Sequence, residues 1–535
     1  MFIVGIDLGT TNTCCYYEHD GKVVHLTDEA GKILFPSCVD FRKDGSTKCG
    51  SIAKYNSVAN TSSSVVMNSK RIIGKQFKCT EVDQMKHYCG LPIVDVNGSP
   101  HFKITTPSRT VSPKEVAAYL IRHILDRVEK VAQKKVTNIC ITIPAHFGNQ
   151  ERVDTLEAVK MAAEKEGLTE DDILIQNEPT AAAICYKYDR TINNGKILVY
   201  DFGGGTFDVS ILEIFNEGIE IKRYGGNPHL GGCDIDMIIV DWVKEVYEEL
   251  YNTPLLPDTL PEKVRRRHER RMLQIAEECK IQLQSLDAVQ FTMPFVSQTK
   301  PATVDDENEF SIDLTRNEFN RRIAGKIQET IDVVKEVLEG KTKGGQGGQK
   351  SQRYTVDDID HVVLVGGSSR IGLVHTELEK MFGEAKLHES VNPDQCVAKG
   401  ACLNLVHKER ITEIIATSLG KTIVNNRVMC VIPRQSALPA EGSVTTYTVR
   451  DNQDEVESFV VQGYQDKNDE ISPYSDNDFK KLAPYSFTGF EKKPAGEVEF
   501  NTTFRMEVDG IVYVTVKEAN TGKILLDHQR IQYKH

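Results

Sequence analysis

Two segments of the sequence combine an apolar strand, an aspartate, a glycine-containing turn and hydroxyl groups in the same order. The first is Val4–Thr11, with Asp7 ahead of the turn, and the second is Leu198–Asp208, about halfway along the chain. Glycines let a backbone bend and bring its N–H groups against an anion, and an aspartate at a strand end suits hydrated Mg²⁺ beside phosphate. Another apolar stretch follows each turn, so both segments are predicted to be strand–turn–strand hairpins that bind phosphate.

The predicted phosphate contacts come from both hairpin turns. They are Gly9, Thr10 and Thr11 in the first turn and Gly203, Gly204, Gly205 and Thr206 in the second, with Asp7 and Asp201 at the strand ends. A single Asp-x-Gly turn is common in ordinary loops, whereas two copies in equivalent contexts favour a nucleotide site. The segments Gly340–Thr342 and Gly420–Thr422 imitate the end of a P-loop but lack its earlier glycine. No G-x-G-x-x-G motif opens a helix, so a dinucleotide site is not supported.

The elements that would position these turns alternate between strands and helices as far as about Val406, which predicts an α/β architecture with partly parallel sheets. Apolar residues recur at helical spacing over Pro113–Lys134, after the capping residue Ser112, and a further helix is expected over Asn149–Gly167. The expected strands are Phe2–Asp7, Cys14–Tyr17, Val23–Leu26, Asn138–Ile143, Lys196–Asp201 and Asp360–Val365. The Gly-, Gln- and Lys-rich segment Gly340–Ser351 is expected to be a surface loop.

From about Ser418 the pattern changes to alternation with a period of two residues, which predicts a separate all-β domain. Its expected strands include Val428–Ile432, Phe459–Gln462, Glu497–Val508 and Ile511–Val516, separated by turn signals such as Asp509-Gly510. The expected organisation is therefore an α/β domain over residues 1–407, a linker over 408–417 and a β domain over 418–535.

Composition restricts the class of partner. The chain has 535 residues, of which 40% are hydrophobic and 27% charged, and its net charge is −12. That balance argues against nucleic acid as a main partner, because phosphate backbones need a field of Lys and Arg. The one basic cluster, Arg265–Arg267 with Arg270 and Arg271, is expected to be a solvated helix face. No secretory signal pattern and no long apolar run is evident, so a cytoplasmic protein without membrane contact is expected.

A series of further motifs resembles the 70-kDa heat-shock chaperone family. The matching segments are Gly5–Thr11, Ser69–Gly74, Asn177–Ala183, Asp201–Asp208, His229–Gly232 and Val365–Ile371. Their order and spacing span essentially residues 1–407. The resemblance implies an actin-like, two-lobed ATPase domain with a duplicated ribonuclease-H-like core, followed by an all-β sandwich domain that binds peptides.

The resemblance also implies roles for individual residues in binding and hydrolysing ATP. Lys70 would contact the terminal phosphate and position the attacking water, while Glu178 would join the network around Mg²⁺ and water. Asp7, Asp201 and Thr206 would hold the metal and phosphate environment, with Asp208 near a K⁺ site. The implied adenosine contacts are Gly232, Glu277, Lys280, Gly367, Arg370 and Asp394. Gln284 stands where the family has a serine, and Pro144 and Arg152 match the pair that relays nucleotide state between domains.

The C-terminal part departs from the family in several places. Val424, Val449 and Val456 fall where the family lines its peptide cleft, but Lys421, Thr446 and Ser458 occupy positions that are usually apolar. Because burying unpaired polar groups is costly, a weaker grip on a leucine-type side chain is expected.

The linker and the end of the chain also depart from the family pattern. The apolar run of the linker is broken in Glu409–Ile415, so altered docking onto the ATPase domain is expected. The chain ends soon after the last predicted strand, which implies a lidless domain and fast peptide exchange.

Three functions are compatible with these observations. The first is an ATP-driven chaperone that works on unfolded or extended polypeptides with J-domain proteins and nucleotide exchange factors. The second is an ATP-binding regulatory protein or co-chaperone scaffold with weak or no peptide binding, favoured by the altered cleft and linker. The third is a small-molecule kinase of the same fold, which the β domain and the chaperone-type motifs disfavour.

Overall fold

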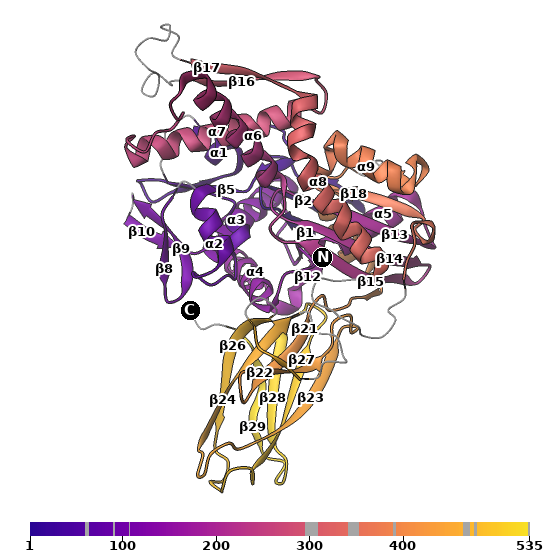
Figure 1. Cartoon of the computed structure of the whole chain (residues 1–535). Helices are drawn as coiled ribbons and strands as arrows, with labels where there is room; N and C mark the ends of the chain where they lie inside the picture. The colour runs from indigo at the N-terminus through magenta and orange to yellow at the C-terminus, as the bar shows by residue number, and fades with distance from the viewer. Residues whose placement is uncertain are drawn as a thin grey trace.

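The computed structural model describes residues 1–58, 64–88, 91–105, 108–294, 309–340, 353–388, 392–463, 471–475 and 479–532. A larger part with two lobes carries a narrower β domain that extends away from it (Figure 1). Each lobe contains one large mixed sheet. The hairpins expected to bind phosphate belong to these two sheets.

The first large sheet has the strand order β12-β11-β1-β2-β3, with β4 paired to β2. Its strands are β1 (Ile3–Leu8), β2 (Asn12–His19), β3 (Lys22–His25), β4 (Leu34–Pro36), β11 (Asn138–Ile143) and β12 (Ile173–Asn177). Strand β1 runs antiparallel to β2 and parallel to β11, which is parallel to β12. The predicted first hairpin is therefore β1–β2, with the Gly9 turn between its strands.

The second large sheet repeats this arrangement. Its order is β19-β18-β13-β14-β15-β20, formed by β13 (Gly195–Phe202), β14 (Phe207–Phe215), β15 (Gly218–Asn227), β18 (His361–Val365), β19 (Leu387–His388) and β20 (Ile411–Thr412). Strand β13 is antiparallel to β14 and parallel to β18, which is parallel to β19. The same sequence of pairings in both sheets confirms the predicted duplicated core.

Helices and small sheets cover and extend the two lobes. The helices are α1 (Gly50–Val58), α2 (Thr80–Tyr88), α3 (Pro113–Ala132), α4 (Asn149–Ala162), α5 (Glu178–Arg190), α6 (Gly232–Tyr251), α7 (Glu262–Gln282), α8 (Arg316–Glu339), α9 (Gly372–Phe382) and α10 (Cys396–His407). The small sheets are β5 (Cys38–Phe41) with β6 (Thr47–Cys49) and β7 (Val65–Met67), β8 (Ile93–Val96) with β9 (Ser99–Thr105) and β10 (Ser108–Val111), and β16 (Ala288–Pro294) with β17 (Glu309–Thr315). Ser112 caps α3 through a reciprocal pair with Glu115, as the sequence predicts.

Two helices, α5 and α10, join the lobes at their centre. Side chains of α5 pack under the second sheet, whereas Ala398 and Cys402 of α10 pack against β1 and β2 of the first. The close contact between α5 and α10 depends on a glycine, because a Cβ on Gly400 of α10 would lie 1.8 Å from the carbonyl oxygen of Ala181 in α5. Each half of the duplicated chain therefore contributes a helix to the other half, which fixes the two lobes around a shared centre.

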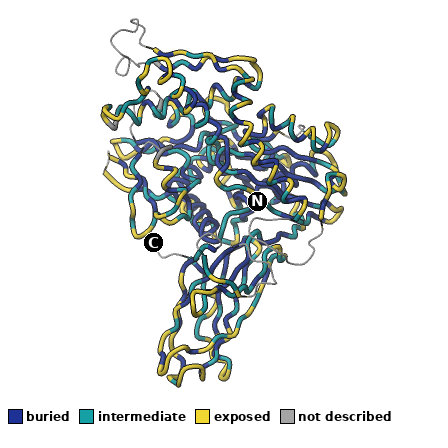
Figure 2. The backbone as a smooth tube through the Cα atoms, viewed as in Figure 1, coloured by how far each residue is buried: buried dark blue, intermediate teal, exposed yellow. Residues whose placement is uncertain are grey.

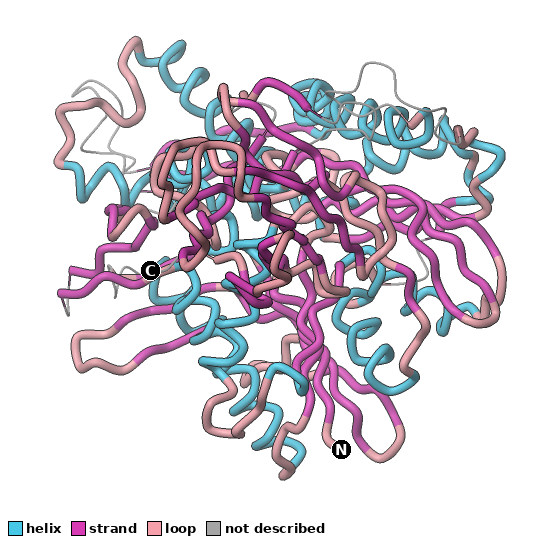
Figure 3. Tube along the Cα trace, turned by 90° about the horizontal axis from the view of Figure 1, so that it is seen from below, coloured by secondary structure: helices cyan, strands magenta, loops and turns pink. Residues whose placement is uncertain are grey.

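The β domain is a sandwich of two antiparallel sheets. One has the order β25-β22-β21-β24-β26 and the other β23-β27-β28-β29. The strands are β21 (Ser418–Ile423), β22 (Arg427–Ile432), β23 (Ala440–Tyr447), β24 (Glu455–Gly463), β25 (Ile471–Pro473), β26 (Phe479–Thr488), β27 (Glu499–Met506), β28 (Val512–Glu518) and β29 (Ile524–Arg530). Phe487 and Phe500 meet across its core with ring centroids 5.0 Å apart. Seen from below, these strands lie in front of the helices and sheets of the lobes (Figure 3).

The linker is docked between the two parts. Its strand β20 adds to the edge of the second large sheet by parallel pairing with β15. The Glu413 carboxylate is buried and accepts hydrogen bonds from Asn177 Nδ2 at 2.9 Å, Thr180 Oγ1 at 2.7 Å and Tyr224 OH at 2.6 Å. The linker is therefore held by backbone pairing and by the buried Glu413 carboxylate. From its broken apolar run, the sequence predicts altered docking.

The β domain also contacts the first lobe directly. Asn149, at the start of α4, donates from Nδ2 to the carbonyl oxygen of Ile531 at 2.5 Å and accepts from the Val512 N–H at 2.8 Å. Ile511 is fully buried in the core of the first lobe. Buried residues therefore continue from the lobes into the junction with the β domain (Figure 2).

Some local predictions differ from the structure. The helix expected over Asn149–Gly167 ends at Ala162, because the N–H groups of Glu166 and Gly167 turn back to the Ala163 carbonyl oxygen and Gly167 adopts a φ of 75°. The expected loop Gly340–Ser351 lies outside the described residues beyond its first residue, which caps α8. In the described ranges, no helix combines the length and apolar character needed to cross a membrane.

Candidate nucleotide site

The two hairpin turns face each other across the lobes. A Cβ added to Gly204 would lie 2.2 Å from Thr11 Oγ1, and one added to Gly205 would lie 3.0 Å from Thr10 Oγ1. Only residues without a side chain allow the second turn to approach the first so closely. The glycines that the sequence assigns to phosphate binding therefore also bring the two halves of the chain together.

A cavity of about 700 Å³ opens between the lobes at these turns. It is lined by Asp7, Gly9, Thr10, Thr11, Lys70, Glu178, Asp201, Gly203, Gly204, Thr206, Gly232, Glu277, Lys280, Gly367, Arg370 and Asp394. These are all the predicted catalytic and adenosine residues and all the predicted phosphate residues except Gly205. The predicted metal residue Asp208 also lies outside the lining. The volume and the convergent polar groups are those of a small-molecule site.

The acidic residues at the strand ends are crowded together and buried, so their ionised forms are unfavourable without a cation. Burial and the neighbouring Glu178 raise the pKa of Asp7 to about 7, and the Lys70 ammonium only partly offsets them. Burial, followed by Glu178 and Asp208, raises the pKa of Asp201 well above its usual range. Clustered carboxylates of this kind favour a cation, so the residues fit a bound divalent ion. Among the described residues, no three His, Cys, Asp or Glu side chains are arranged to ligate a metal directly.

Lys70 and Glu178 form a nearly buried ion pair at the cavity. Lys70 Nζ lies 2.7 Å from Glu178 Oε1, and the side chains are 9% and 11% exposed. Lys70 belongs to the short 3-10 helix Ser69–Ile72, and Glu178 is the first residue of α5, ahead of Pro179. From the sequence alone, Lys70 could be a solvated surface residue and Glu178 an ordinary acid in the first turn of a helix. The structure instead brings both side chains together beside the two hairpins.

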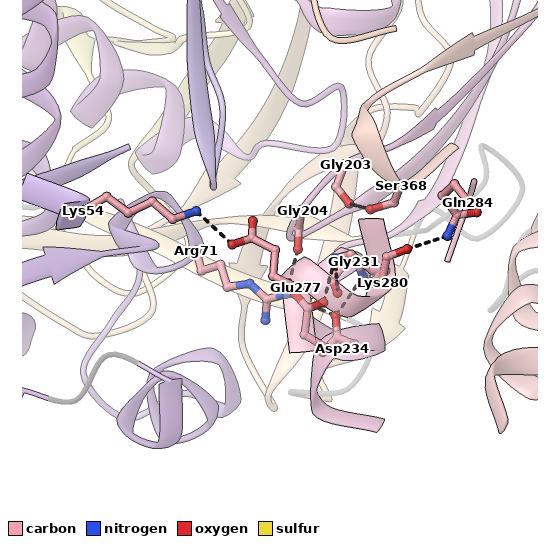
Figure 4. Close-up of polar contacts among 12 residues, drawn as sticks. Lys54, Arg71, Gly203, Gly204, Gly231, Asp234, Glu277, Lys280, Gln284 and Ser368 are labelled. Carbon is pink, nitrogen blue, oxygen red and sulfur yellow. Dashed lines mark hydrogen bonds and ion pairs between the residues drawn. The ribbon is translucent and has the colours of Figure 1, made fainter. Parts of the chain in front are cut away.

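Two ion pairs connect the lobes across the cavity, and sequence reasoning misses both. Arg71 Nη2 lies 3.1 Å from Asp234 Oδ2 and 3.4 Å from the Gly204 carbonyl oxygen. Lys54 Nζ of α1 lies 2.8 Å from Glu277 Oε2 of α7 (Figure 4). Arg71 directly follows Lys70 in the segment Ser69–Gly74, so its position in the sequence indicates that it lies near the site. Lys54 carries no such signal, because only the tertiary fold brings α1 opposite α7.

The predicted adenosine residues lie on α6, on α7, in the short 3-10 helix before α9 and, for Asp394, just before α10. Lys280 Nζ contacts Asp236 Oδ1 at 2.8 Å and the Gly232 carbonyl oxygen at 3.1 Å. Gln284, the departure from the family pattern, donates to the Lys280 carbonyl oxygen at 2.6 Å and accepts from the Gly372 N–H at 3.0 Å. The glutamine therefore links α7 to the start of α9 (Figure 4).

Arg370 is held in place at the opposite side of the predicted adenosine region. Its guanidinium lies 2.9 Å from Asp394 Oδ2 and 2.9 Å from Asn392 Oδ1. About half of the side chain remains exposed. A fixed and partly exposed guanidinium plane is suited to stacking on a planar ring.

The basic cluster of α7 is not simply a solvated helix face, so that expectation is wrong. Arg267, Arg270 and Arg271 line the cavity, together with the neighbouring His268. Helical periodicity separates polar from apolar faces but does not tell which polar face looks onto a cleft. The lining of the cavity thus contains cationic side chains of α7 as well as the acidic strand ends.

Asp208 has an unexpected neighbour. His146 Nδ1 lies 2.8 Å from Asp208 Oδ1, and the carboxylate is buried. This contact occupies one oxygen of the residue that the family resemblance assigns to K⁺. His146 comes shortly after strand β11, close to the predicted coupling residue Pro144, and its separation of 62 residues from Asp208 hides the pair in the sequence.

The predicted coupling pair lies between the cavity and the β domain. Pro144 is buried directly after β11, and Arg152 is only 8% exposed. The Arg152 guanidinium donates to the Asp509 carbonyl oxygen of the β domain at 2.9 Å and to Asn177 Oδ1 at 3.0 Å. It therefore connects the β domain to the residue that precedes Glu178.

The predicted cleft residues of the β domain are not part of this cavity. Val424 and Val449 are 59% and 58% exposed, and Val456 is half-buried. They belong to the loops and strands of the sandwich.

The fold and the cavity together define a two-lobed protein of the actin-like class with an attached β-sandwich domain. A family model described as "Hsp70 protein" matches residues 3–532, and the chain belongs to this family. Chaperone protein DnaK 3 of Synechococcus sp. is 30% identical over 528 residues, which cover 97% of this chain and 75% of the relative. Chaperone protein dnaK of Cyanidioschyzon merolae is 32% identical over 528 residues, covering 97% of this chain and 80% of the relative. Members of the Hsp70 family are ATPases that bind polypeptides and co-chaperones.

Proposed function

We propose that this protein is an ATP-dependent chaperone that hydrolyses ATP slowly and couples nucleotide state to the binding of extended polypeptide. The observation that carries the proposal is the convergence of two glycine-containing hairpins and the Lys70–Glu178 pair on one cavity. Phosphoryl transfer depends mostly on positioning and charge neutralisation, and these groups supply both.

Within this proposal, the chain's own groups bind the phosphates and orient a water molecule. Backbone N–H groups of Gly9–Thr11 and Gly203–Thr206 bind phosphate oxygens, and Lys70 places its ammonium beside the terminal phosphate. Glu178 holds Lys70 and accepts a hydrogen bond from the attacking water. Asp7, Asp201 and Asp208 provide the carboxylates for Mg²⁺, which neutralises phosphate charge when bound, and for K⁺.

The adenosine moiety is assigned to the wider part of the same cavity. Glu277 and Lys280 on α7 provide hydrogen-bonding groups to the ribose and base, and Arg370 provides a face for stacking. Gly232 and Gly367 leave room for the ligand, and Asp394 orients Arg370. In the same proposal, Pro144 and Arg152 transmit nucleotide state to the β domain, where Val424, Val449 and Val456 line the peptide cleft.

The proposed function is tested by steady-state ATP hydrolysis with and without an unfolded peptide and a J-domain protein. The expected result is faster turnover with either addition, since J-domain proteins and nucleotide exchange factors are the proposed partners. Lys70→Ala is expected to abolish hydrolysis while leaving nucleotide binding, measured by calorimetry. Hydrolysis that survives in Lys70→Ala would contradict the catalytic assignment.

A regulatory or scaffold protein that binds ATP is the second candidate. It is favoured by one observation, the polar side chains Lys421 and Ser458 buried where the cleft is expected to be apolar. The same assay separates the two, because a scaffold gives equal rates of hydrolysis with and without peptide and J-domain protein.

A further inference from the structure

Lys421 points into the β sandwich instead of out to solvent. It lies in β21 directly opposite Val460 of β24, and residues opposite each other in an antiparallel pair project from the same face. Val460 is fully buried in the core of the sandwich, and Lys421 itself is only 3% exposed. Lysine is almost never this deeply buried without a partner. Its position therefore calls for a physical explanation.

No charged group of the described residues compensates the Lys421 ammonium. No carboxylate of the described residues lies within ion-pair distance of Nζ, which lies 5.8 Å from the centroid of the Tyr485 ring. Burial alone lowers the pKa of Lys421 to about 8, with no contribution from another charge. A cation at the limit of the cation–π range gains little to offset its dehydration. The buried ammonium thus has no anionic partner in the part of the chain that the structure describes.

Hydroxyl groups gather around Tyr485, whose ring lies 5.8 Å from the Lys421 ammonium. Ser458 lies opposite Tyr485 in the β24–β26 pair and two residues before Val460. The Tyr485 hydroxyl is close enough to the Ser458 and Thr502 hydroxyls for both to affect its pKa. Even so, the hydroxyls of Tyr485 and Thr502 make no hydrogen bond of normal geometry within the described chain. Each hydroxyl can donate one hydrogen bond, so together with the Lys421 ammonium these groups offer several donors to a carboxylate, which only accepts.

The site lies within reach of the predicted peptide cleft. Val424 is three residues beyond Lys421, which corresponds to about 10 Å along an extended chain, and it is largely exposed. Strand β21 begins opposite Gly463, next to Gln462, which accepts a hydrogen bond from the Asn149 N–H of the ATPase domain. The chain therefore runs from this junction past Lys421 toward the exposed Val424. A peptide side chain that enters between the sheets from that end meets the ammonium.

We propose that the β sandwich binds extended peptides through an acidic side chain, whose carboxylate pairs with Lys421 and accepts hydrogen bonds from Tyr485 and Thr502. This inference rests on the proposed peptide-binding function and defines its substrate class. Ser458 uses its hydroxyl to donate to the Thr422 carbonyl oxygen at 3.3 Å, which keeps its oxygen beside the pocket. A leucine side chain would leave all of these polar groups unpaired, which is costly.

The test is fluorescence anisotropy with short peptides that are acetylated at one end and amidated at the other. They differ only at the central residue, which is glutamate, glutamine or leucine, so the side chain is their sole variable charge. The wild-type protein is expected to bind the glutamate peptide at least ~10-fold tighter than the glutamine peptide. Lys421→Met is expected to lose this preference and to favour leucine. Lys517→Met, the same change at an exposed lysine of β28, is expected to behave like wild type.

Several outcomes would overturn the proposal. They are tighter binding of the leucine peptide by the wild type, an unchanged glutamate preference in Lys421→Met, or no peptide binding. Circular dichroism shows whether each variant is folded, and methionine at this position needs no partner. ATP hydrolysis measured on the same preparations separates the two proposals. Stimulated turnover without a glutamate preference refutes only the acidic pocket, whereas absent hydrolysis refutes the proposed function.

Discussion

Removing the Glu413 carboxylate should release the linker from the ATPase domain. Glu413 is 6% exposed and accepts hydrogen bonds from Asn177, Thr180 and Tyr224. Hydrogen bonds to a charged group contribute roughly 1.5–3 kcal/mol each, and dehydration of the carboxylate offsets much of their sum. A net loss of about 3 kcal/mol for Glu413→Ala corresponds to roughly a hundredfold larger undocked population.

Trypsin cleavage after Arg410 measures this population. In the docked linker the Arg410 carbonyl oxygen accepts a hydrogen bond from the Ile219 N–H at 2.9 Å, so the bond cannot enter a protease site. When docking and undocking are fast, the cleavage rate follows the undocked fraction. Mass spectrometry of the fragments should show about a hundredfold faster cleavage in Glu413→Ala. Glu457→Ala, at an exposed carboxylate of β24, is the control.

An unchanged rate of cleavage after Arg410 in Glu413→Ala would refute the reasoning. It would mean that the parallel pairing of β20 with β15 suffices to hold the linker. Glu413→Gln should fall between the two, because the amide keeps an acceptor oxygen but loses the charge.

Two further perturbations address the hairpins and the buried lysine. Gly204→Ala is expected to weaken ATP binding at least ~10-fold in calorimetry, because the added Cβ would lie 2.2 Å from Thr11 Oγ1. The control is Gly325→Ala, whose Cβ would meet no atom within 4 Å and which should bind ATP normally. Equal affinities of the two variants would show that the hairpin turns separate freely. Lys421→Met is expected to raise the free energy of unfolding by about 3 kcal/mol near neutral pH, because burial lowers the pKa of the lysine from 10.5 to about 8. As pH rises from about 8 to above 10, Lys421 loses its proton in the folded state before it does so in the unfolded state, and the wild type regains this stability. The difference in the free energy of unfolding between the two proteins, measured by urea unfolding, should therefore shrink over that window. A constant difference would contradict the buried charge.

The hairpins and regular elements could be predicted because their signals are local. The order of strand, acid and glycine specifies each hairpin, and Ser112 before Pro113 specifies the start of α3 through its cap. Strand β11 has the predicted bounds, Asn138–Ile143, since its largely apolar run ends at Pro144, which cannot donate a hydrogen bond to a neighbouring strand. These features need no knowledge of distant parts of the chain.

The remaining features depend on contacts between distant residues. Glu413 receives donors from β12, α5 and β15, so a broken apolar run in the linker says little about its docking. Lys54 and Glu277 meet only because the lobes close, and their sequence separation of 223 hides the pair. The sequence identifies Lys421 as a polar residue in an apolar context. The absence of a charged partner in the described structure becomes evident only from the packing of both sheets.

Isothermal titration calorimetry of the full chain with ATP and Mg²⁺ tests the central claim most directly. If the two hairpins enclose one nucleotide site, a single ATP should bind with measurable heat, and Gly204→Ala should weaken it. The absence of binding heat, confirmed by the absence of any change in bound radiolabelled ATP, would contradict a nucleotide site between the lobes.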